Sequence, residues 1–487
     1  MAEQSLKSKT VKGLGWSAVD NIGKAGITFI VSIVLARLLS PEEYGLIGIL
    51  TIFVNVFNEI VDSGFTSALI RKKDAKEVDF CTVFYTNLVV SVFMAALLYL
   101  AANPIASFFN RPELVELTQV MSCIVVINAF CFVQKARTTK NIDFKTQSKV
   151  TYISYTLSGI IGILLAVKGF GVWALVWQQI SAQLFTAISF WIFNKWMPKL
   201  IFSWESFKEM WTFGWKLLVS SLIDTTWKEI YQVVVGKCYS PATLGLYTRA
   251  KQFSQLFSSN LTAIIQRVSY PVLSTIQDDR PRLKSAYQRV IKTTMLPTFV
   301  CMFGMAAVAK PMILVLLGEK WTGCIPFLIL ICIHGSLYPL HAINLNMLKV
   351  QGRSDLFLKL EIIKKFVAVG PLLLGIFIDI YLMVGCSIIT SCFNYYLNAY
   401  YSGPYLNYSI KDQVKDILPS FFVAITMAIP VGTMQFINLN PFVLLPLQII
   451  IAASIVITIC EKRQLPEYLE IKGIAMPIIN KVIRRNK

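Results

Sequence analysis

Ser40-Pro41-Glu42-Glu43-Tyr44-Gly45-Leu46 recurs two hundred residues later as Ser240-Pro241-Ala242-Thr243-Leu244-Gly245-Leu246, with the pattern Ser-Pro-x-x-x-Gly-Leu in common. Each copy joins one long apolar segment to the next. A Gly-Trp pair stands near the head of the earlier segment in both halves, as Gly15-Trp16 and as Gly214-Trp215. A phrase that returns with the same neighbours indicates that the chain contains an internal duplication.

Composition places the chain in a membrane. Of its residues 55% are hydrophobic and 15% are charged, and the mean hydropathy is +0.60. A soluble chain carries nearer a quarter of charged residues. The apolar stretches that are long enough to span a bilayer are 13–38, 44–69, 79–102, 114–135, 148–168, 172–194, 211–236, 244–273, 290–317, 324–350, 358–378, 380–403, 414–437 and 440–460. We therefore predict an all-α integral membrane protein with about fourteen transmembrane helices.

The duplication divides these spans into two sets of six. Because an even number of crossings returns the chain to its starting side, the two repeats should be parallel, related by a pseudo-twofold axis along the membrane normal. The predicted domains are a first six-helix lobe at 1–200, a second at 201–405, two additional transmembrane helices at 406–460 and a basic tail at 461–487. For the tail, both an interfacial helix and a frayed end remain open.

The net charge of +19 follows the predicted membrane topology. With the N-terminus inside the cell, most of the 46 Lys and Arg residues fall on inner loops, such as 71–76, 135–149 and 280–292, or in the tail. This is the positive-inside pattern, and it predicts that both termini are cytoplasmic. Because the basic residues follow the topology, the charge does not indicate a nucleic-acid partner.

The second helix of each half carries a polar face. The first face consists of Asn55, Glu59, Asp62 and Thr66, and the second of Thr248, Gln252, Gln255, Ser259, Thr262, Gln266 and Ser269. Both sets recur at helical spacing, and four pairs match at an offset of two hundred residues. Hydrogen bonds between packed helices would explain one or two such residues. Seven in register favour a shared, water-filled interior.

Glu59 lies near the centre of its span. At 1.5 Å per residue it is about 3 Å from the membrane midplane and reaches neither surface. It must therefore be paired, protonated or hydrated, and it becomes a candidate for ion coupling or substrate contact. Asp62 lies one turn nearer the cytoplasm on the same face.

The first helix of each half carries an Asp and a Lys four residues apart, as Asp20 with Lys24 and as Asp224 with Lys228. An intrahelical salt bridge that lowers the cost of insertion explains these pairs as well as a functional role does.

Arg249 and Arg267 are eighteen residues apart and therefore in line on one helix. Each can snorkel to a surface. Together with the lysines they could also form a cationic wall that suits phosphate or pyrophosphate. The predicted cavity residues are Lys24, Asn55, Glu59, Asp62, Asp224, Lys228, Arg249, Gln252, Gln255, Ser259, Thr262, Gln266 and Arg267, and the predicted ion-coupling residues are Asp20, Glu59, Asp62 and Asp224.

No cofactor is expected. His334 and His341 are seven residues apart on one helix face, but no third ligand accompanies them, so we expect no metal site. No Walker sequence is present, which argues against ATP hydrolysis.

Three stretches resemble the polysaccharide transporter family, which contains the O-antigen, teichuronic acid and exopolysaccharide flippases. They are Val11-Lys12-Gly13-Leu14-Gly15-Trp16-Ser17, Leu35-Ala36-Arg37-Leu38-Leu39-Ser40-Pro41-Glu42-Glu43-Tyr44-Gly45-Leu46 and Asp62-Ser63-Gly64-Phe65-Thr66-Ser67-Ala68-Leu69-Ile70-Arg71. The resemblance is close over the first seventy residues, and the plan of fourteen spans covers the rest.

The resemblance implies two six-helix lobes that form a V in a bacterial plasma membrane, around a cavity that opens alternately to either side. It implies a flippase, not an enzyme, with an undecaprenyl-pyrophosphate-linked oligosaccharide as its cargo. Its implied partners are this lipid-linked oligosaccharide, membrane lipid and a polysaccharide polymerase or glycosyltransferases. The lipid II flippase of the same superfamily carries arginines on its first, second and eighth helices. Here the second helix carries Glu59 and Asp62 instead.

Two alternatives remain. A multidrug or cation antiporter of the same superfamily would favour an acidic, aromatic-lined cavity, whereas the basic residues and the Ser-Pro-Glu-Glu-Tyr-Gly-Leu phrase favour a flippase. A membrane polymerase, ligase or glycosyltransferase would be expected to have a large outer loop, and the predicted outer loops are short. Coupling to a proton or sodium gradient is a hypothesis that rests on Glu59.

Overall fold

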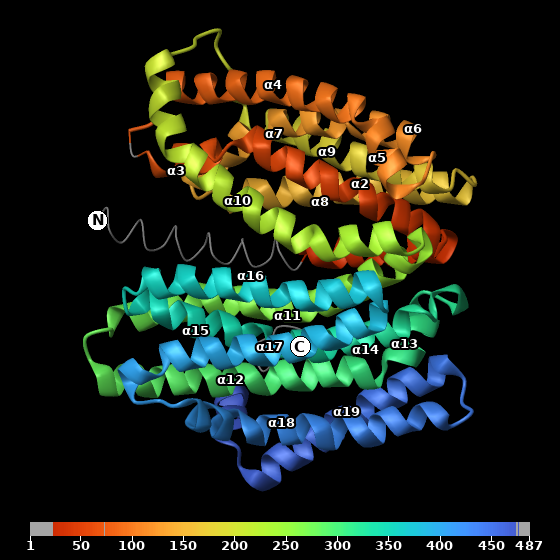
Figure 1. The fold of residues 1–487 in the computed structure, drawn as a ribbon, viewed down its shortest axis with the longest axis vertical. Coiled ribbons are helices and arrows are strands. Elements are labelled where there is room, and N and C mark those ends of the chain that lie inside the picture. Colours follow the sequence, from red (N-terminus) through yellow and green to blue (C-terminus); the bar gives the residue numbers. More distant parts are fainter. Residues whose placement is uncertain (1–22, 73, 474–475, 477–487) are drawn as a thin grey trace, which may run out of the picture. The chain divides into compact units, whose positions relative to one another are not determined.

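The computed structural model describes residues 23–72, 74–473 and 476, which form helices joined by short connections, with no strand among them (Figure 1). The chain forms two compact units, residues 1–245 and residues 246–487. The predicted six-helix lobes at 1–200 and 201–405 describe repeats and not these units, and they remain a prediction.

Unit 1 opens, in its described part, with a helix over 23–38. The elements that follow are α2 (Pro41–Asp62), α3 (Phe65–Arg71), α4 (Glu77–Leu100), α5 (Ala102–Phe109), α6 (Leu114–Met121), α7 (Cys123–Lys140), α8 (Phe144–Val167), α9 (Val172–Asn194) and α10 (Trp204–Cys238). The first turn of α11 (Pro241–Thr275) also belongs to this unit. Within it, α8 packs along α9, and α2 packs against α4, α7 and α10.

Unit 2 contains the rest of α11. Its further elements are α12 (Arg280–Ala307), α13 (Ala309–Leu316), η1 (Glu319–Trp321), α14 (Cys324–Gly335), α15 (Tyr338–Val350), α16 (Ser354–Phe377), α17 (Ile380–Ser402), η2 (Pro404–Leu406), α18 (Ile410–Thr433), η3 (Met434–Phe436) and α19 (Pro441–Arg463). An apolar cluster of this unit includes Tyr287 and Phe299 of α12, with Leu340 of α15 and Tyr395 of α17.

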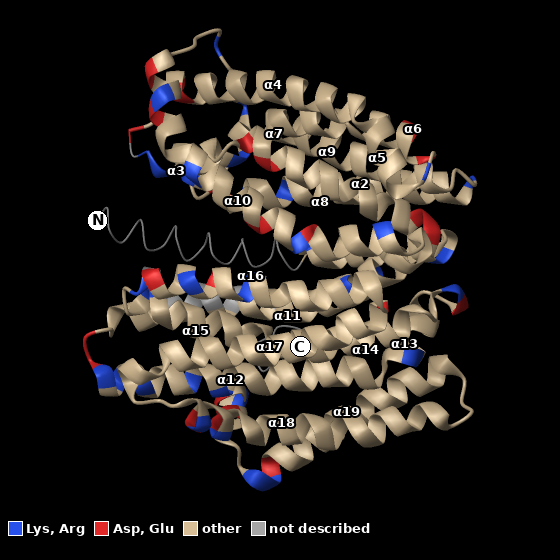
Figure 2. Cartoon of the chain, viewed as in Figure 1, with Lys and Arg blue, Asp and Glu red and all other residues tan. Residues whose placement is uncertain are grey.

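Within the described residues, nine helical stretches are long and apolar enough to cross a membrane. They are Pro41–Asp62, Glu77–Leu100, Leu114–Lys140, Phe144–Val167, Arg280–Ala307, Cys324–Val350, Ile380–Ser402, Ile410–Phe436 and Pro441–Arg463. Charged residues gather towards the ends of the helices and are sparse along their middles (Figure 2). The prediction of an all-helical, multi-pass membrane protein is confirmed. The count of fourteen spans, the parallel repeats and the V remain predictions.

The two copies of the repeated phrase pack against each other in unit 1. Each begins a helix. The Ser40 hydroxyl accepts a hydrogen bond from the Glu43 amide at 3.3 Å, and the Ser240 hydroxyl accepts one from the Thr243 amide at 3.1 Å. A β-carbon added to Gly45 would lie 1.8 Å from the carbonyl oxygen of Pro241, and one added to Gly245 would lie 1.8 Å from that of Pro41. The contact is therefore reciprocal and is made by backbone alone.

A second close contact fixes the other end of α2. Gly64, with φ +69°, follows the helix, and a β-carbon there would lie 2.5 Å from the carbonyl oxygen of Gly214 in α10. A β-carbon on Gly214 would lie 2.7 Å from the carbonyl oxygen of Ser63. Helix α2 is thus held against α11 at its start and against α10 at its end.

Residues 466–473, at the start of the basic tail, form a helix that packs on unit 2. The Ser420 hydroxyl donates to the carboxylate of Glu467 at 3.1 Å, and the Nε of Arg289 lies 2.6 Å from Oε1 of Glu470. The described part of the tail is therefore a docked helix and not a frayed end.

Replacing Gly45 with Ala should destabilise the contact between the repeated phrases. The added methyl group would have to displace the Pro241 backbone, and overpacking of this kind costs about 1–3 kcal/mol. We expect a lower apparent melting temperature in detergent solution. The matched control is Gly385→Ala in α17, where nothing lies within 4 Å of an added β-carbon. Equal melting temperatures for the two variants would contradict the contact.

Candidate functional site

The predicted polar face of α2 meets α10 within unit 1. The amide of Asn55 donates to Oε1 of Glu229 at 3.4 Å, and the amide of Gln232 donates to the other oxygen of Glu229. Further along α2, Glu59 is half-buried. Asp62 accepts hydrogen bonds from the backbone amide of Thr66 at 3.3 Å and from its hydroxyl group.

We call Asn55, Glu59, Asp62, Thr66, Glu229 and Gln232 the α2–α10 polar strip. Within the strip, the carboxylates of Asp62 and Glu229 accept hydrogen bonds from amides and a hydroxyl group. The charges of Glu59 and of Lys135 in α7 act on Asp62 from nearby. The strip therefore offers several hydrogen-bond acceptors to an ion or to a hydroxyl-rich ligand.

Of the two predicted Asp–Lys pairs, the pair on α10 lies wholly within the described residues, and the other only through its lysine. Asp224 and Lys228 form an ion pair at 2.5 Å on α10, and both side chains are exposed. The ammonium of Lys24 lies 4.7 Å from the centre of the Tyr155 ring in α8. Asp20 lies outside the described residues.

On the predicted polar face of α11, some side chains are buried inside unit 2 and others are exposed. Arg249 is 3% exposed, donates to Gln252 at 2.9 Å and lies over the Trp321 ring. Thr262 is buried as well, and its hydroxyl group donates to the Ser258 carbonyl at 2.6 Å. Gln252 and Gln255 are exposed, and Ser259 is half-buried. The side chains of Gln266 and Arg267 are outside the described part. Whether these residues line one cavity with the α2–α10 polar strip stays a prediction.

Glu229 and Gln232 were not predicted from the sequence. Their signal was present, because an acidic residue inside the apolar segment 211–236 is costly unless it has a partner. The repeat drew attention to α2 and α11, whereas the observed partner of Asn55 lies on α10.

A separate cluster of charges joins α3, α4 and α10 at an end of unit 1 that the sequence predicts to be cytoplasmic. Lys72 Nζ lies 3.0 Å from the Asp79 carboxylate and 2.8 Å from that of Glu209. Partial burial opposes the charged ammonium, but hydrogen bonds to Glu209 and Asp79 outweigh it and raise the pKa of Lys72. These pairs stabilise the folded protein fully at pH values below about 10.4, the pKa of a lysine such as Lys72 in the unfolded chain. The stabilisation is lost only as the pH rises through the raised pKa of Lys72 in the folded protein.

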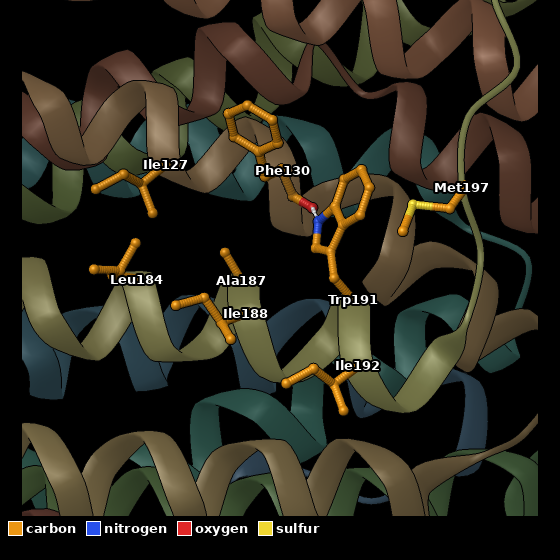
Figure 3. A pocket seen from close by; sticks show the side chains of 8 residues that line it. All are labelled: Ile127, Phe130, Leu184, Ala187, Ile188, Trp191, Ile192 and Met197. Atoms are coloured by element: carbon orange, nitrogen blue, oxygen red, sulfur yellow. Dashed lines mark hydrogen bonds between the residues drawn. The ribbon is translucent and has the colours of Figure 1, made fainter.

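An apolar cavity of about 610 Å³ lies between α7 and α9 (Figure 3). Its lining residues are Ile127, Phe130, Leu184, Ala187, Ile188, Trp191, Ile192 and Met197. The indole nitrogen of Trp191 donates to the Phe130 carbonyl at 3.2 Å, so its one polar group is already used. This lining suits hydrocarbon and does not suit a saccharide. In the described residues, no group of three His, Cys, Asp or Glu could hold a metal ion.

The fold is that of a known multi-helix membrane protein. The fold of this chain resembles the solved structure of the lipid II flippase MurJ in an inward closed conformation, with a TM-score of 0.73 and 16% sequence identity, over 92% of this chain and 98% of that chain. At this identity the likeness shows the fold alone.

The sequence defines the family. The sequence pattern of the polysaccharide biosynthesis protein family matches residues 34–326, and the chain belongs to this family. The succinoglycan biosynthesis transport protein ExoT of Rhizobium meliloti (strain 1021) is 25% identical over 372 residues, which cover 76% of this chain and 75% of that protein. The teichuronic acid biosynthesis protein TuaB of Bacillus subtilis (strain 168) is 26% identical over 358 residues, which cover 72% and 73%. The resemblance seen in the first seventy residues is confirmed.

Asp79→Asn should destabilise unit 1 by about 2 kcal/mol, because Asp79 is 1% exposed and Lys72 would lose its buried partner. Glu209→Gln is the matched control, since Glu209 is 56% exposed and such pairs contribute under about 1 kcal/mol. Apparent melting temperatures in detergent measure both. A larger effect for Glu209→Gln would refute this ranking.

Proposed function

We propose that this protein is a flippase that moves an undecaprenyl-pyrophosphate-linked oligosaccharide across the bacterial plasma membrane. The observation that carries the proposal is the family match over residues 34–326, which includes both repeated phrases and the whole α2–α10 polar strip. It is supported by a relative named for transport in succinoglycan biosynthesis and by the fold shared with a lipid II flippase.

The chemistry of the strip fits the head group of such a cargo. Sugar hydroxyls donate hydrogen bonds to carboxylate and amide oxygens, and Glu59, Asp62 and Glu229 supply such acceptors. The exposed lysines Lys24 and Lys228 would attract the pyrophosphate. The polyprenyl chain would stay in the bilayer, where no polar site is needed.

We further propose that flipping proceeds by alternating access. The close contact between the repeated phrases lies at the end of α2 that the charge pattern assigns to the outer side. It would have to separate when the cargo leaves towards that side. A contact of glycine and carbonyl groups is suited to opening and closing, because it ties up no charged or large apolar side chain.

The alternatives are less well supported. A multidrug antiporter would not account for the match to a polysaccharide biosynthesis family. A polymerase, ligase or glycosyltransferase finds no support in the relative that is named for transport in succinoglycan biosynthesis.

The direct test is flipping by the purified protein in proteoliposomes. The probe is a fluorescent derivative of the polyprenyl-pyrophosphate-linked saccharide extracted from the source cells. We expect flipping to exceed that of protein-free liposomes and to be competed by the unlabelled lipid. Flipping at the protein-free rate would overturn the proposal.

Glu59→Gln should abolish flipping of this lipid or remove its dependence on pH. The substitution keeps the shape of the side chain but removes the charge from the polar face of α2, in its last turn, where a carboxylate can bind an ion. Glu116→Gln, at an exposed position of α6, is the matched control. Unchanged rates and pH dependence in Glu59→Gln would exclude Glu59 from coupling and from cargo contact.

A further inference from the structure

A line of buried polar side chains runs along one face of α17 inside unit 2. Its members are Ser387, Ser391, Tyr395, Asn398 and Ser402. Their fifteen-residue extent corresponds to about 22 Å of helix. Helix α17 packs against α14, α15 and α16 (Figure 1). In an apolar interior, such a line requires polar partners on the neighbouring helices.

The two histidines of the chain supply some of these partners. His334 Nδ1 lies 2.9 Å from the Ser387 carbonyl oxygen. His341 Nε2 lies 3.0 Å from the Ser391 hydroxyl oxygen, and its Nδ1 lies 3.4 Å from the amide nitrogen of Asn398. Because that amide donates, Nδ1 is the acceptor, and Nε2 carries the ring proton. His341 therefore contacts the line through both ring nitrogens.

Hydrogen bonds extend the line past Asn398 towards the end of α17. The hydroxyl group of Ser402, one turn further on, donates to Oδ1 of Asn344 at 2.7 Å. The hydroxyl group of Tyr287 in α12 donates to the same oxygen at 2.8 Å. The rings of Tyr287 and Tyr408 then meet edge to face at 5.8 Å.

The line ends at an ion pair. The Tyr408 hydroxyl donates to one oxygen of Asp416 at 2.7 Å, and the other oxygen lies 2.8 Å from Lys292 Nζ. Burial, together with this hydrogen bond and the charge of Asp416, raises the pKa of Tyr408, so the phenol remains a proton donor. Lys292 belongs to the basic run 280–292, which the sequence assigns to the cytoplasmic side.

Two buried polar atoms along the line have no hydrogen-bond partner: Oδ1 of Asn398 and Nε2 of Gln413. Both side chains are fully buried, and Gln413 meets the line through Tyr395 at 3.5 Å. Unpaired polar atoms in an interior are costly and are commonly satisfied by bound water. The unpaired oxygen of Asn398 marks a position where water would bind beside the one-turn gap to Ser402, and Nε2 of Gln413 marks a second position, near Tyr395.

The opposite end of the line is apolar. One to two turns beyond His334 and Ser387 stand Phe327, Leu328 and Met383, each at most 1% exposed. From His341 towards the Asp416 end the line is therefore polar, and water would have to fill two steps, from Asn398 to Ser402 and across the ring contact of Tyr287 with Tyr408, whereas the other end is apolar.

We propose that this line is a proton half-channel, through which His341 exchanges a proton with the cytoplasmic side and couples it to flipping. The coupling part rests on the proposed function. The proton adds to Nδ1 of the neutral ring. The Asn398 amide then turns, so that its oxygen, unpaired in this structure, accepts from the new N–H. The proton leaves from the same nitrogen, and no other reactant is consumed.

The charges around His341 explain how a proton would shift the structure. Lys364, paired with Glu361, acts on His341 from α16, and His334 acts from the end of α14. Tyr287 of α12 and Tyr395 of α17 are buried titratable groups on the helices that pack against α15. A proton on His341 would repel Lys364 and favour an arrangement of unit 2 in which the two are further apart.

The first test compares flipping in proteoliposomes with and without an imposed proton gradient. We expect His341→Gln to keep gradient-free flipping and to lose stimulation by the gradient. Ser391→Ala, which removes only the partner of Nε2, should weaken the stimulation and keeps the test valid if His341→Gln does not fold. Ser420→Ala, at a buried site of α18 outside the line, is the control and should behave as the unaltered protein. Retained stimulation in both His341→Gln and Ser391→Ala would overturn the proposal.

A second test does not depend on the cargo. Since the chain has two histidines, isotope-labelled imidazoles give two sets of nuclear magnetic resonance signals, which His334→Gln assigns. In the full-length protein, we expect Nδ1 of His341, the nitrogen at which the proposed proton binds and leaves, to show faster proton exchange with water than the ring nitrogens of His334. Asn344→Leu should slow this exchange. If the unaltered protein does not flip the lipid, the proposed function fails, and this exchange still decides on the half-channel. Exchange unaffected by Asn344→Leu would refute it.

Discussion

The reciprocal contact between the two Ser-Pro-x-x-x-Gly-Leu phrases is the constraint on which the rest of unit 1 depends. Gly45 faces the Pro241 carbonyl and Gly245 faces the Pro41 carbonyl, at separations that no side chain could tolerate. Serine caps start both helices at this point and so fix which residues meet. Since α2 is also held at Gly64 and Gly214, its polar face is presented to α10 along a defined register.

A second constraint comes from the polar side chains that are buried inside each unit. Apolar interiors accept hydrogen-bonding groups only when these are paired or hydrated. Unit 1 meets this condition with the strip around Glu59 and Glu229, and unit 2 with the line around His341. The first strip is rich in carboxylates and suits an ion or a hydroxylated ligand. The second is made mostly of neutral groups and suits proton transfer. The proposed flippase would use the two for different tasks.

The sequence predicted the helical membrane fold because hydropathy depends on composition alone, and nine helical stretches among the described residues are long and apolar enough to cross a membrane. It also predicted the polar face of α2, because helical periodicity does not depend on neighbours. It did not predict Glu229 as the partner of Asn55, or the burial of Arg249 beside Trp321, because these depend on which helices pack together. The sequence predicted no metal site at His334 and His341 and assigned them no other role, because their contacts with α17 can be recognised only from tertiary structure.

The central claim is that the contact between the repeated phrases opens during transport. Distances between spin labels at positions 42 and 242, each one residue past a repeated proline, would test it in a background without the ten native cysteines. A single short distance is expected for the protein in lipid vesicles without cargo. Addition of the lipid-linked saccharide should bring out a second, longer distance. A short distance that stays unchanged under all conditions while flipping continues would contradict the account.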